Sequence, residues 1–366
     1  MLERTGAPLG LDELELAPPG PGEVLIRLRA AGVCHSDFNA IDGTAETLCP
    51  AVLGHEGAGV VESAGDGVGL APGTHVVLNW LPACGRCEEC LRELPHLCRE
   101  TWRTMGEGGL LDGTSRLSRH GEPVYHYCFL STFAERAVVP AQCCIPIPDD
   151  VPFDVAALVG CAITAGTGSV WRTAGVRPGD RVAVLGCGGV GLSAVLGAAA
   201  VGANPIVAVD VADDKLEAAL GLGATDAVMW ADGPEETAER VREASGGGVD
   251  YAIEATGRTD AARAAFLATR ARGAAVLIGI TATDAELSLP ALSIPRMERR
   301  VLGSVYGSAR PERDFPALLA LYRRGRLPLD RLVGARLPLE AIDDAFALLR
   351  DGGPGRVVLE LDGAAA

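Results

Sequence analysis

The sequence predicts an α/β protein built from an irregular β-rich domain and a doubly wound parallel sheet of six strands. Residues 1–160 carry short apolar runs separated by glycine and proline, which is typical of a β-domain with many turns. From about residue 163, apolar runs alternate with Ala/Leu-rich stretches, which predicts strands covered by helices on both faces. The length of 366 residues also favours about two domains.

The apolar runs give the expected order of elements. The β-rich part is expected to use strands at 23–28, 76–80 and 133–139. The parallel sheet is expected to use six runs, at 181–185, 206–210, 226–229, 250–254, 274–280 and 301–306. The last stretch returns to mixed helix and strand, with candidates at 315–324, 339–350 and 356–361. We therefore expect residues 1–162 and 307–366 to form one domain and residues 163–306 to form the other.

Composition and charge restrict the class of protein. The net charge of −16 argues against nucleic acid or an anionic membrane as a partner. No N-terminal stretch has the layout of a signal peptide, and no uninterrupted apolar run reaches the roughly 18 residues of a membrane span. We therefore expect a cytoplasmic protein, in which the 11 cysteines serve metal binding or redox chemistry rather than a disulfide framework.

A glycine-rich turn follows the first strand of the expected parallel sheet. The stretch RVAVLGCGGVG places a strand before Gly186-x-Gly188-x-x-Gly191, and a helix of small residues follows. These glycines permit a tight turn, close approach to a pyrophosphate and packing of helix on strand. The next strand ends at Asp210, 19 residues past Gly191, where a carboxylate can bind ribose hydroxyls and repel a 2′-phosphate. The pattern predicts a Rossmann site that prefers NAD to NADP, with Lys215, the lone lysine, at the same ribose edge.

Four cysteines lie close together at the spacing C-x2-C-x2-C-x7-C: Cys84, Cys87, Cys90 and Cys98. Four thiolates complete a tetrahedral zinc site and leave no position for water or substrate, which is typical of a structural zinc. Disulfides and a redox C-x-x-C are the alternatives. The expected compartment disfavours the first, and the lack of a strand-to-helix context disfavours the second. His96 lies within the cluster and is expected on the surface.

A sparser set of metal-binding side chains is spread over more than a hundred residues: Cys34 in GVCHSD, His55 in LGHEG and Cys161 in LVGCAITAG. Two cysteines and one histidine leave the fourth position of a zinc ion open, which is the catalytic pattern. Spacing alone does not group them, because buried cysteines are often inert core residues. We expect that inert role for the other five, Cys49, Cys128, Cys143, Cys144 and Cys187.

Taken together, GVCHSD, GHEGAGVV, the four-cysteine segment, GC-x-x-T-x-G and GCGGVG followed by Asp210 resemble the zinc-dependent medium-chain alcohol dehydrogenases over almost the whole chain. This resemblance implies a GroES-like catalytic domain, a Rossmann domain, NAD, and two zinc ions per subunit. LLDGTSRLSRHGEPVYHY followed by STFAE is similar to the longer, usually dimeric members, so a homodimer is expected. The tail YGSARPERDFPALLALYRRGRLPLD is similar to bacterial aryl-alcohol and thiol-dependent formaldehyde dehydrogenases.

The resemblance also implies roles for individual residues. Cys34, His55 and Cys161 are expected to bind the catalytic zinc, and Cys84, Cys87, Cys90 and Cys98 the structural zinc. Asp37 is expected to orient the histidine ligand, Glu56 to place a carboxylate near the metal, and Ser36 to take the substrate proton. The implied NAD contacts are His35, Gly186, Gly188, Gly189, Val190, Gly191, Asp210, Lys215, Ile278, Ile280, Ser304, Tyr306 and Arg356.

Four positions depart from the family pattern. Asn39 stands where many members have a histidine that ends the proton relay, so the relay must finish through water or another group. Ala165 replaces a threonine beside the nicotinamide. Trp80, at a wall of the substrate pocket, either narrows the pocket or offers a stacking surface. Trp102, next to Arg103, stands where the glutathione-dependent branch has an anchoring arginine, and this weakens a glutathione-dependent role.

The expected function is a zinc-dependent oxidoreductase that transfers hydride reversibly between NAD and an alcohol. The alcohol is primary, possibly aromatic, or secondary, and the product is an aldehyde or a ketone. A thiol-dependent formaldehyde dehydrogenase and a nicotinoprotein alcohol dehydrogenase with permanently bound NAD are the alternatives. A non-enzymatic zinc and nucleotide binding protein is disfavoured, because Ser36 and all three ligands of the open zinc site are present.

Overall fold

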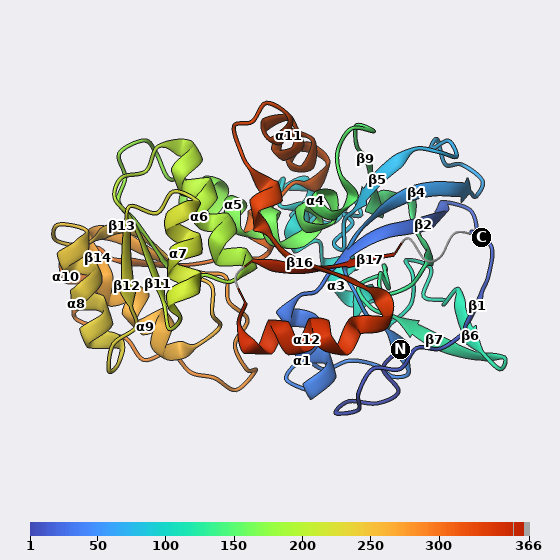
Figure 1. Ribbon diagram of the computed structural model, residues 1–366, viewed down its shortest axis with the longest axis horizontal. Coiled ribbons are helices and arrows are strands. Elements are labelled where there is room, and N and C mark those ends of the chain that lie inside the picture. The colour runs from blue at the N-terminus through green and yellow to red at the C-terminus, as the bar shows by residue number, and fades with distance from the viewer. Residues whose placement is uncertain (354, 362–366) are drawn as a thin grey trace.

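The computed structural model describes residues 1–353 and 355–361. Figure 1 shows an elongated molecule with a helix-covered sheet at one end and a β-rich body at the other. The colours show that the first and last parts of the chain share the β-rich end, while the middle of the chain forms the other. The predicted fold class, a β-rich part combined with a helix-covered parallel sheet, is therefore confirmed.

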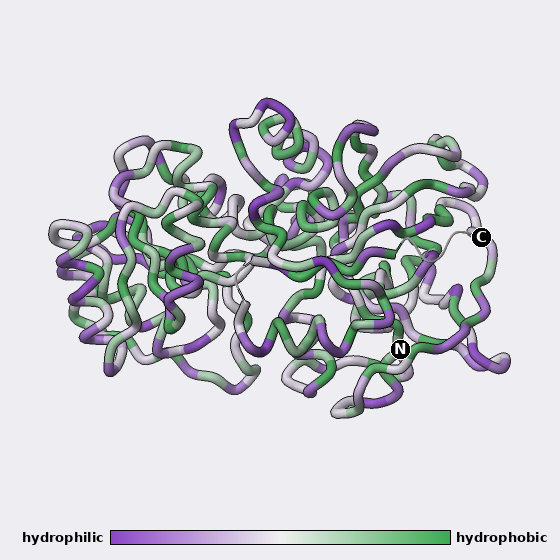
Figure 2. The backbone as a smooth tube through the Cα atoms, viewed as in Figure 1, coloured by the Kyte–Doolittle hydropathy of each residue, from purple (hydrophilic) through white to green (hydrophobic). Residues whose placement is uncertain are grey.

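The sheet at the first end has six parallel strands in the order β12-β11-β10-β13-β14-β15. Its strands are β10 (Val182–Leu185), β11 (Ile206–Asp210), β12 (Asp226–Met229), β13 (Val249–Glu254), β14 (Thr269–Leu277) and β15 (Arg300–Gly303). The helices around it are α6 (Gly189–Val201), α7 (Asp213–Gly221), α8 (Pro234–Ala244), α9 (Thr259–Ala268) and α10 (Ser293–Met297). Because helices cover both faces, the central strands are apolar throughout, as the interior of this end in Figure 2 shows.

Two strand ends differ from the sequence prediction. The strand expected at 274–280 ends at Leu277, and the one expected at 301–306 ends at Gly303. The carbonyl of Glu254 accepts hydrogen bonds from the backbone N–H groups of both Ile278 and Gly279, at 3.0 and 3.1 Å. These bonds turn the chain out of the ladder, so residues 278–280 are free to line a cavity instead of extending the sheet.

The β-rich end contains two further sheets. The larger has the order β16-β17-β2-β4-β5-β9, with β8 also paired to β2, and the smaller has the order β1-β6-β7-β3. Strand β17 lies next to β2, which brings the end of the chain beside its beginning. The strands are β1 (Glu15–Leu16), β2 (Glu23–Gly32), β3 (Ala51–Val52), β4 (Glu56–Ala64), β5 (His75–Leu78), β6 (Leu117–Arg119), β7 (Glu122–His126), β8 (Arg136–Pro140), β9 (Cys144–Pro146), β16 (Val333–Pro338) and β17 (Arg356–Glu360).

Short helices connect the strands of the β-rich end, and two longer helices come after the parallel sheet in the chain. Helix α11 begins at Pro311, four residues before the predicted start, because proline is well tolerated in the first turn. The helix predicted at 339–350 begins as a 3-10 turn at Leu339–Ala341 and continues as α12. The helices are α1 (His35–Asp42), α2 (Glu88–Leu91), α3 (Arg99–Met105), α4 (Phe153–Leu158), α5 (Thr164–Gly168), α11 (Pro311–Arg323) and α12 (Ile342–Asp351).

A continuous helical segment, Phe153–Ala174, connects the two ends of the molecule. Its 22 residues are long and apolar enough to cross a membrane by length and composition. However, 89% of its apolar window is buried inside the protein, as expected for a core helix. The predicted domain boundary between residues 162 and 163 falls inside this segment, and the division into domains stays a prediction.

Candidate active site and metal centres

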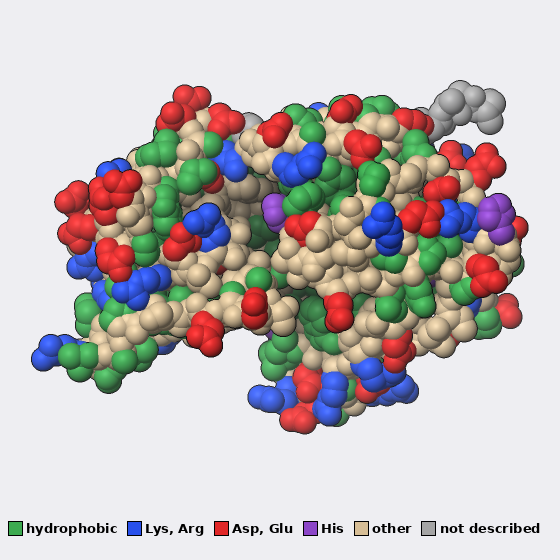
Figure 3. Space-filling view, turned by 90° about the horizontal axis from the view of Figure 1, so that it is seen from below, with side chains coloured by type: hydrophobic (Ala, Val, Ile, Leu, Met, Phe, Trp, Pro, Cys, Tyr) green, Lys and Arg blue, Asp and Glu red, His purple; other side chains and the backbone are tan. Residues whose placement is uncertain are grey.

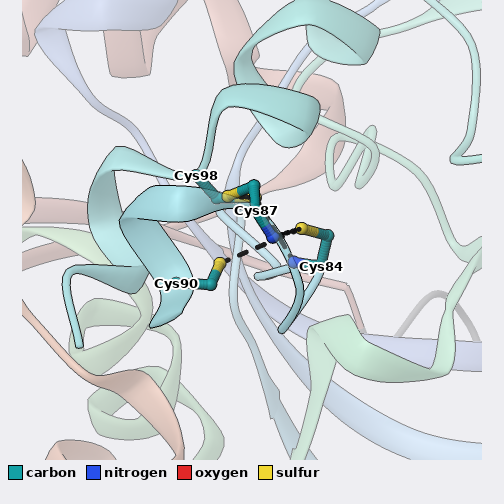
Figure 4. Close-up of side chains that lie close together, drawn as sticks. All are labelled: Cys84, Cys87, Cys90 and Cys98. Atoms are coloured by element: carbon teal, nitrogen blue, oxygen red, sulfur yellow. Dashed lines mark hydrogen bonds between the residues drawn. The ribbon is translucent and has the colours of Figure 1, made fainter. Parts of the chain in front are cut away.

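The four clustered cysteines converge in space. Their sulfur atoms all lie within 4.8 Å of one another, and Figure 4 shows the side chains directed to a common centre from the loop before α2, from α2 and from the start of α3. The backbone N–H of Cys84 donates to Cys98 Sγ, and that of Cys87 donates to Cys84 Sγ, each at 3.3 Å. N–H groups directed at sulfur stabilise thiolates, so this donor set fits a closed zinc site.

The pKa values of the clustered thiols Cys98 and Cys90 are shifted in opposite directions by burial and by their hydrogen-bond partners. Burial alone raises the pKa of Cys98, but hydrogen bonds from Thr101 and the Cys84 backbone overcome it and lower that pKa to about 6. Burial and the Cys87 thiol raise the pKa of Cys90 to about 12. A metal ion bound among the sulfurs would displace the remaining protons to solvent.

The expectation that His96 lies on the surface is wrong. Its side chain is buried, with 7% of the residue exposed, and its carbonyl accepts a hydrogen bond from Trp102 Nε1 at 3.2 Å. His96 thus links the cysteine segment to the tryptophan that lines the neighbouring cavity. A histidine in a cysteine-rich loop is usually exposed, so the sequence did not indicate that His96 is buried.

A second cluster joins residues from three distant segments. The ligand atoms of Cys34, His55, Cys161 and Glu56 lie within 4.8 Å of one another, and all four residues are buried. Cys34 caps α1 just after β2, His55 immediately precedes β4, and Cys161 lies in a π-helical turn of the Phe153–Ala174 segment. Such turns frequently occur at functional sites.

Pairing of β2 with β4 holds this cluster together. Gly32 pairs with Glu56, which places Cys34 and His55 near the same end of the two strands. A Cβ atom at Gly32 would lie 2.0 Å from Glu56 Oε2, so only glycine leaves room for this carboxylate. The strand predicted at 23–28 stopped short of Gly32, so nothing in the sequence indicated this role.

Asp37 fixes the histidine of the cluster. Its Oδ1 lies 2.9 Å from His55 Nδ1, and its Oδ2 accepts a hydrogen bond from the Cys34 backbone at 3.0 Å. Both side chains are buried. A carboxylate on Nδ1 sets the ring orientation and leaves Nε2 as the ligand atom, as is typical of metal-binding histidines.

The electrostatics of the second cluster favour a bound cation. The hydrogen bond from Cys161 lowers the pKa of Cys34 well below that of a free thiol and raises that of Cys161. Burial would lower the pKa of His55, but Asp37 and Cys34 outweigh it and raise that pKa. Burial also raises the pKa of Glu56 to about 7, although Arg356 opposes it.

The surroundings of Glu56 test whether the second cluster suits a metal ion. Both of its carboxylate oxygens are buried and lack a hydrogen-bond partner within residues 1–353 and 355–361. A buried carboxylate without hydrogen bonds is costly unless cations lie nearby. Arg356 Nη2, 3.0 Å from Oε1, is one such cation, and a metal ion among the neighbouring donors would be another. The two cysteine sulfurs and the imidazole form the three-donor set of a zinc ion with an open coordination position, and Glu56 stands beside them as a nearby carboxylate.

A cavity of about 490 Å³ lies over the carboxyl ends of β10 and β11. Gly186, Gly188, Gly189 and Val190 line it, while Gly191 lies behind the turn. A Cβ atom at Gly191 would stand 1.7 Å from the Gly186 carbonyl oxygen, so a larger residue would prevent α6 from starting here. Arg356 Nε and Nη2 are buried without hydrogen-bond partners in the described chain, and Nε lies 3.0 Å from the position of a Cβ atom on Gly189. These unused donors at a helix N-terminus fit a dinucleotide pyrophosphate.

Asp210 ends β11 at the opposite side of this cavity. Its Oδ2 accepts the Cys187 N–H at 2.6 Å, and its Oδ1 accepts the Val211 N–H at 2.7 Å. Lys215 Nζ lies 3.9 Å from Oδ1. The carboxylate is therefore held rigidly at the position that the sequence predicted for a ribose contact.

A second cavity, of about 750 Å³, adjoins the first. Seen from below, the surface is hollowed between the two ends of the molecule (Figure 3). Both cavities are lined by a common set, Cys34, Ser36, Asn39, Val190, Ile278 and Ile280. A ligand in the second cavity therefore reaches Cys34, His55 and Cys161, and a ligand in the first reaches Cys34. Ser36 Oγ lies 3.7 Å from Cys34 Sγ.

Aromatic side chains form the wall of the second cavity. The Trp80 ring packs against Tyr306 at 4.7 Å, Trp102 at 6.0 Å and His55 at 6.1 Å between centroids. Trp80 therefore offers a ring surface to the cavity rather than closing it. Ala165 also lines this space, so the missing threonine enlarges it.

The remaining predicted cofactor residues lie around the two cavities. His35 lines the first, Ser304 and Tyr306 line the second, and Ile278 and Ile280 line both. The Ser304 hydroxyl is already hydrogen-bonded to Thr173, and the Tyr306 hydroxyl donates to the Gly160 carbonyl. These two residues therefore offer backbone rather than polar side-chain atoms to a ligand.

Sequence reasoning missed several cavity residues: Leu48, Met105, Tyr127 and Cys128. Tyr127 donates to the Ser36 carbonyl at 3.1 Å and packs on the His55 ring. Cys128 was expected to be an inert core residue, but it lines the substrate-side cavity. The motif YHY contained Tyr127, but only its contact with Ser36 reveals its place at the site.

Comparisons with known proteins agree with this geometry. Residues 20–149 match the alcohol dehydrogenase GroES-like domain, and residues 189–324 match the zinc-binding dehydrogenase family. The chain is 37% identical over 357 residues to an alcohol dehydrogenase class-3 from Myxine glutinosa, covering 97% of this chain and 95% of that protein.

Two solved structures share the fold over nearly the full chain. A zinc-binding-domain alcohol dehydrogenase protein from Burkholderia ambifaria has a TM-score of 0.92 at 36% identity, covering 98% of this chain and 96% of that one. A benzyl alcohol dehydrogenase from Acinetobacter calcoaceticus has a TM-score of 0.91 at 30% identity, covering 98% and 97%.

The two metal centres predict opposite responses to loss of a cysteine. Cys98→Ser should lower the melting temperature by at least about 5 °C, because a closed metal site stabilises the fold. Cys161→Ser should change the melting temperature less but reduce NAD-dependent alcohol turnover about a thousandfold or more, since the open site carries the chemistry. Calorimetry, metal analysis and an NADH-absorbance assay measure these effects.

Cys49→Ser is the matched control, because Cys49 is half-buried and belongs to neither cluster. It should keep both the full metal content and the activity. Normal turnover by Cys161→Ser, or an unchanged melting temperature in Cys98→Ser, would contradict the assignment of the two sites.

Asp210→Ala should relax discrimination between the two nicotinamide cofactors. Loss of a charge-assisted hydrogen bond to the ribose should weaken NADH binding about 10- to 100-fold. NADPH binding should weaken less or improve, because the repulsion of a 2′-phosphate disappears. Fluorescence titration with both cofactors measures the ratio of the NADH and NADPH dissociation constants. The same ratio in the parent protein and in Asp210→Ala would refute this role of Asp210.

Proposed function

This chain belongs to the zinc-dependent medium-chain alcohol dehydrogenases, and we propose that its substrates are aromatic primary alcohols, which it oxidises reversibly to aldehydes with NAD. One observation carries the choice of substrate. The cavity beside Cys34 and Ser36 is walled by the rings of Trp80, Trp102 and Tyr306. Apolar rings favour a substrate that is itself a flat aromatic ring.

We assign the catalytic zinc to Cys34, His55 and Cys161, and the structural zinc to Cys84, Cys87, Cys90 and Cys98. When bound, the catalytic zinc acts as a Lewis acid that lowers the pKa of an alcohol, and NAD accepts the hydride. Asp37 holds His55 in the orientation that this requires. Glu56 adds a buried negative charge beside the ligands, which Arg356 balances.

Ser36 moves the proton in this proposal. Its hydroxyl lies at the junction of the two cavities, where it can accept the alcohol proton and pass it to a ribose hydroxyl. The Tyr127 hydroxyl holds the Ser36 carbonyl and so fixes this part of α1. Asn39 shares both cavities but cannot take up a proton, so the proton leaves to solvent through the open cofactor cavity.

The apolar lining of the second cavity also argues against the thiol-dependent formaldehyde dehydrogenase alternative. A peptide thiol such as glutathione carries carboxylates, and recognition of carboxylates generally uses arginine or lysine. None of the described residues that line the second cavity is arginine or lysine. Arg103, the nearest candidate in sequence, lies 2.6 Å from Glu107 on the surface of α3. The benzyl alcohol dehydrogenase relative further supports an aromatic substrate.

We also propose that the chain acts as a homodimer, with residues 1–162 and 307–366 as its catalytic domain and residues 163–306 as its NAD domain. Strand β15 forms one edge of the parallel sheet and pairs with β14 alone among the described strands. Val301 on this edge is 40% exposed, and nearby Leu292 is 67% exposed. An open edge with exposed apolar side chains is suited to pairing with a second copy. A cytoplasmic location stays a prediction that cell fractionation can test.

The substrate proposal predicts a preference for benzylic over short aliphatic alcohols. Benzyl alcohol should give at least about tenfold higher kcat/KM than ethanol, because stacking and burial of the ring add binding free energy. Trp102→Ala should reduce kcat/KM for benzyl alcohol more than for ethanol. An NADH-absorbance screen with and without added thiols measures this.

Leu91→Ala is the control, because Leu91 is 73% exposed on the cysteine segment and lines neither cavity. It should leave both rates unchanged. Formaldehyde oxidation that appears only with added thiol, without benzyl alcohol activity, would establish the alternative. NAD that remains bound through gel filtration would instead identify a nicotinoprotein.

The dimer proposal predicts that a charge at the sheet edge separates the subunits. Leu292→Asp should shift the mass measured by light scattering toward that of one chain, because the buried charge opposes association. Leu11→Asp is the control, since Leu11 is 59% exposed in the N-terminal segment, away from this edge. A monomeric parent protein, or equal effects of the two substitutions, would contradict the proposed interface.

A further inference from the structure

Arg350 lies at the mouth of the cofactor cavity, in the last turn of α12. Its guanidinium carbon stands 6.0 Å from the centroid of the Phe38 ring on α1, and Figure 1 shows α12 beside α1. Five residues after Arg350, Gly355 forms a parallel bridge with Gly188 of the phosphate turn. Arg350 therefore lies in the segment that leads to the turn proposed to receive the pyrophosphate.

The other cations of this cavity already have carboxylate partners. Arg356 lies 3.0 Å from Glu56, Lys215 lies 3.9 Å from Asp210, and Arg258 lies 2.6 Å from Asp260. Arg350 also lines the cavity and has neither an ion pair nor a hydrogen bond through its side chain within the described part of the chain. Among the described residues, it is thus the lining arginine or lysine without a carboxylate partner, and it would act together with the unpartnered Nε of Arg356.

The first turn of α1 shows why a positive charge from α12 is needed at this cavity. Its His35 also lines the cavity and packs on the same Phe38 ring, at 5.6 Å between centroids. A histidine ring offers two nitrogen atoms, whereas the guanidinium of arginine presents five N–H donors in a fork that matches phosphate oxygens. The whole chain carries a net charge of −16, so a dianionic pyrophosphate requires local positive charge to bind.

We propose that Arg350 binds the cofactor pyrophosphate from the rim of the cavity and supplies there the guanidinium that His35 lacks. Phe38 positions both side chains, with Arg350 over its ring and His35 beside it. This inference rests on the proposed use of NAD, and it adds a residue of α12 to the cofactor site.

Calorimetric binding to the unmodified protein and to Arg350→Gln tests the role of this residue without relying on turnover. The substitution should weaken NADH and ADP-ribose about tenfold or more, because both carry the pyrophosphate. The dissociation constant of adenosine, which has no phosphate, should be the same in both proteins. Arg350→Lys should lose less affinity than Arg350→Gln, and His35→Arg added to Arg350→Gln should restore ADP-ribose binding.

Arg313→Gln is the matched control, because Arg313 is exposed on α11 and lines neither cavity. Unchanged ADP-ribose affinity in Arg350→Gln would overturn the inference while leaving the proposed function intact. Equal weakening in Arg313→Gln, or equal loss of adenosine binding, would also overturn it by showing a general effect of charge or folding. An unmodified protein that binds no NADH would overturn the proposed function and this inference together.

Discussion

The buried ion pair between Glu56 and Arg356 connects the metal cluster to the phosphate turn. Its atoms lie 3.0 Å apart, and both side chains are almost fully buried. Burying two charges is costly, and removing one partner strands the other, so each residue constrains the position of its neighbour. Glu56 belongs to the cluster with Cys34, His55 and Cys161, while Arg356 lies against Gly189 at the start of α6. The distance between the proposed sites of metal and cofactor is therefore set by one charge pair and the strands that carry it.

Those strands explain how residues from both ends of the chain share one site. Strand β17 carries Arg356 and pairs with β2, which leads into Cys34, while β4 carries Glu56 on the other side of β2. Glycines stand where the charged side chains need space, at Gly32 beside Glu56 and at Gly189 beside Arg356. A sheet register, rather than a loop, thus positions the reactive groups, which suits a site in which small displacements are costly.

Local features of the site could be predicted from the sequence, and long-range ones could not. The phosphate turn and the four-cysteine segment each lie within about fifteen residues, so spacing carries their geometry. Cys34, His55 and Cys161 meet only through strand pairing and a π-helical turn, and family resemblance rather than spacing grouped them. His96 was misplaced because its burial depends on the folding of the whole cysteine segment, in which Trp102 donates to the His96 carbonyl. The cavity wall of Leu48, Met105, Tyr127 and Cys128 had no periodic signal at all.

Helix α1 presents some side chains to the metal cluster and others to the cofactor cavity. Cys34 and Asp37 are buried against the metal cluster, and Asp37 also bonds the Cys34 backbone, so neither can change without loss of the site. His35 instead faces the cofactor cavity, and Phe38 carries a contact with α12. On this side the Phe38 ring contacts both His35 and Arg350, which brings α12 to the cofactor cavity. A histidine at 35 and an arginine at 350 are therefore best understood as one feature of the cofactor site, distributed over two elements that are far apart in sequence.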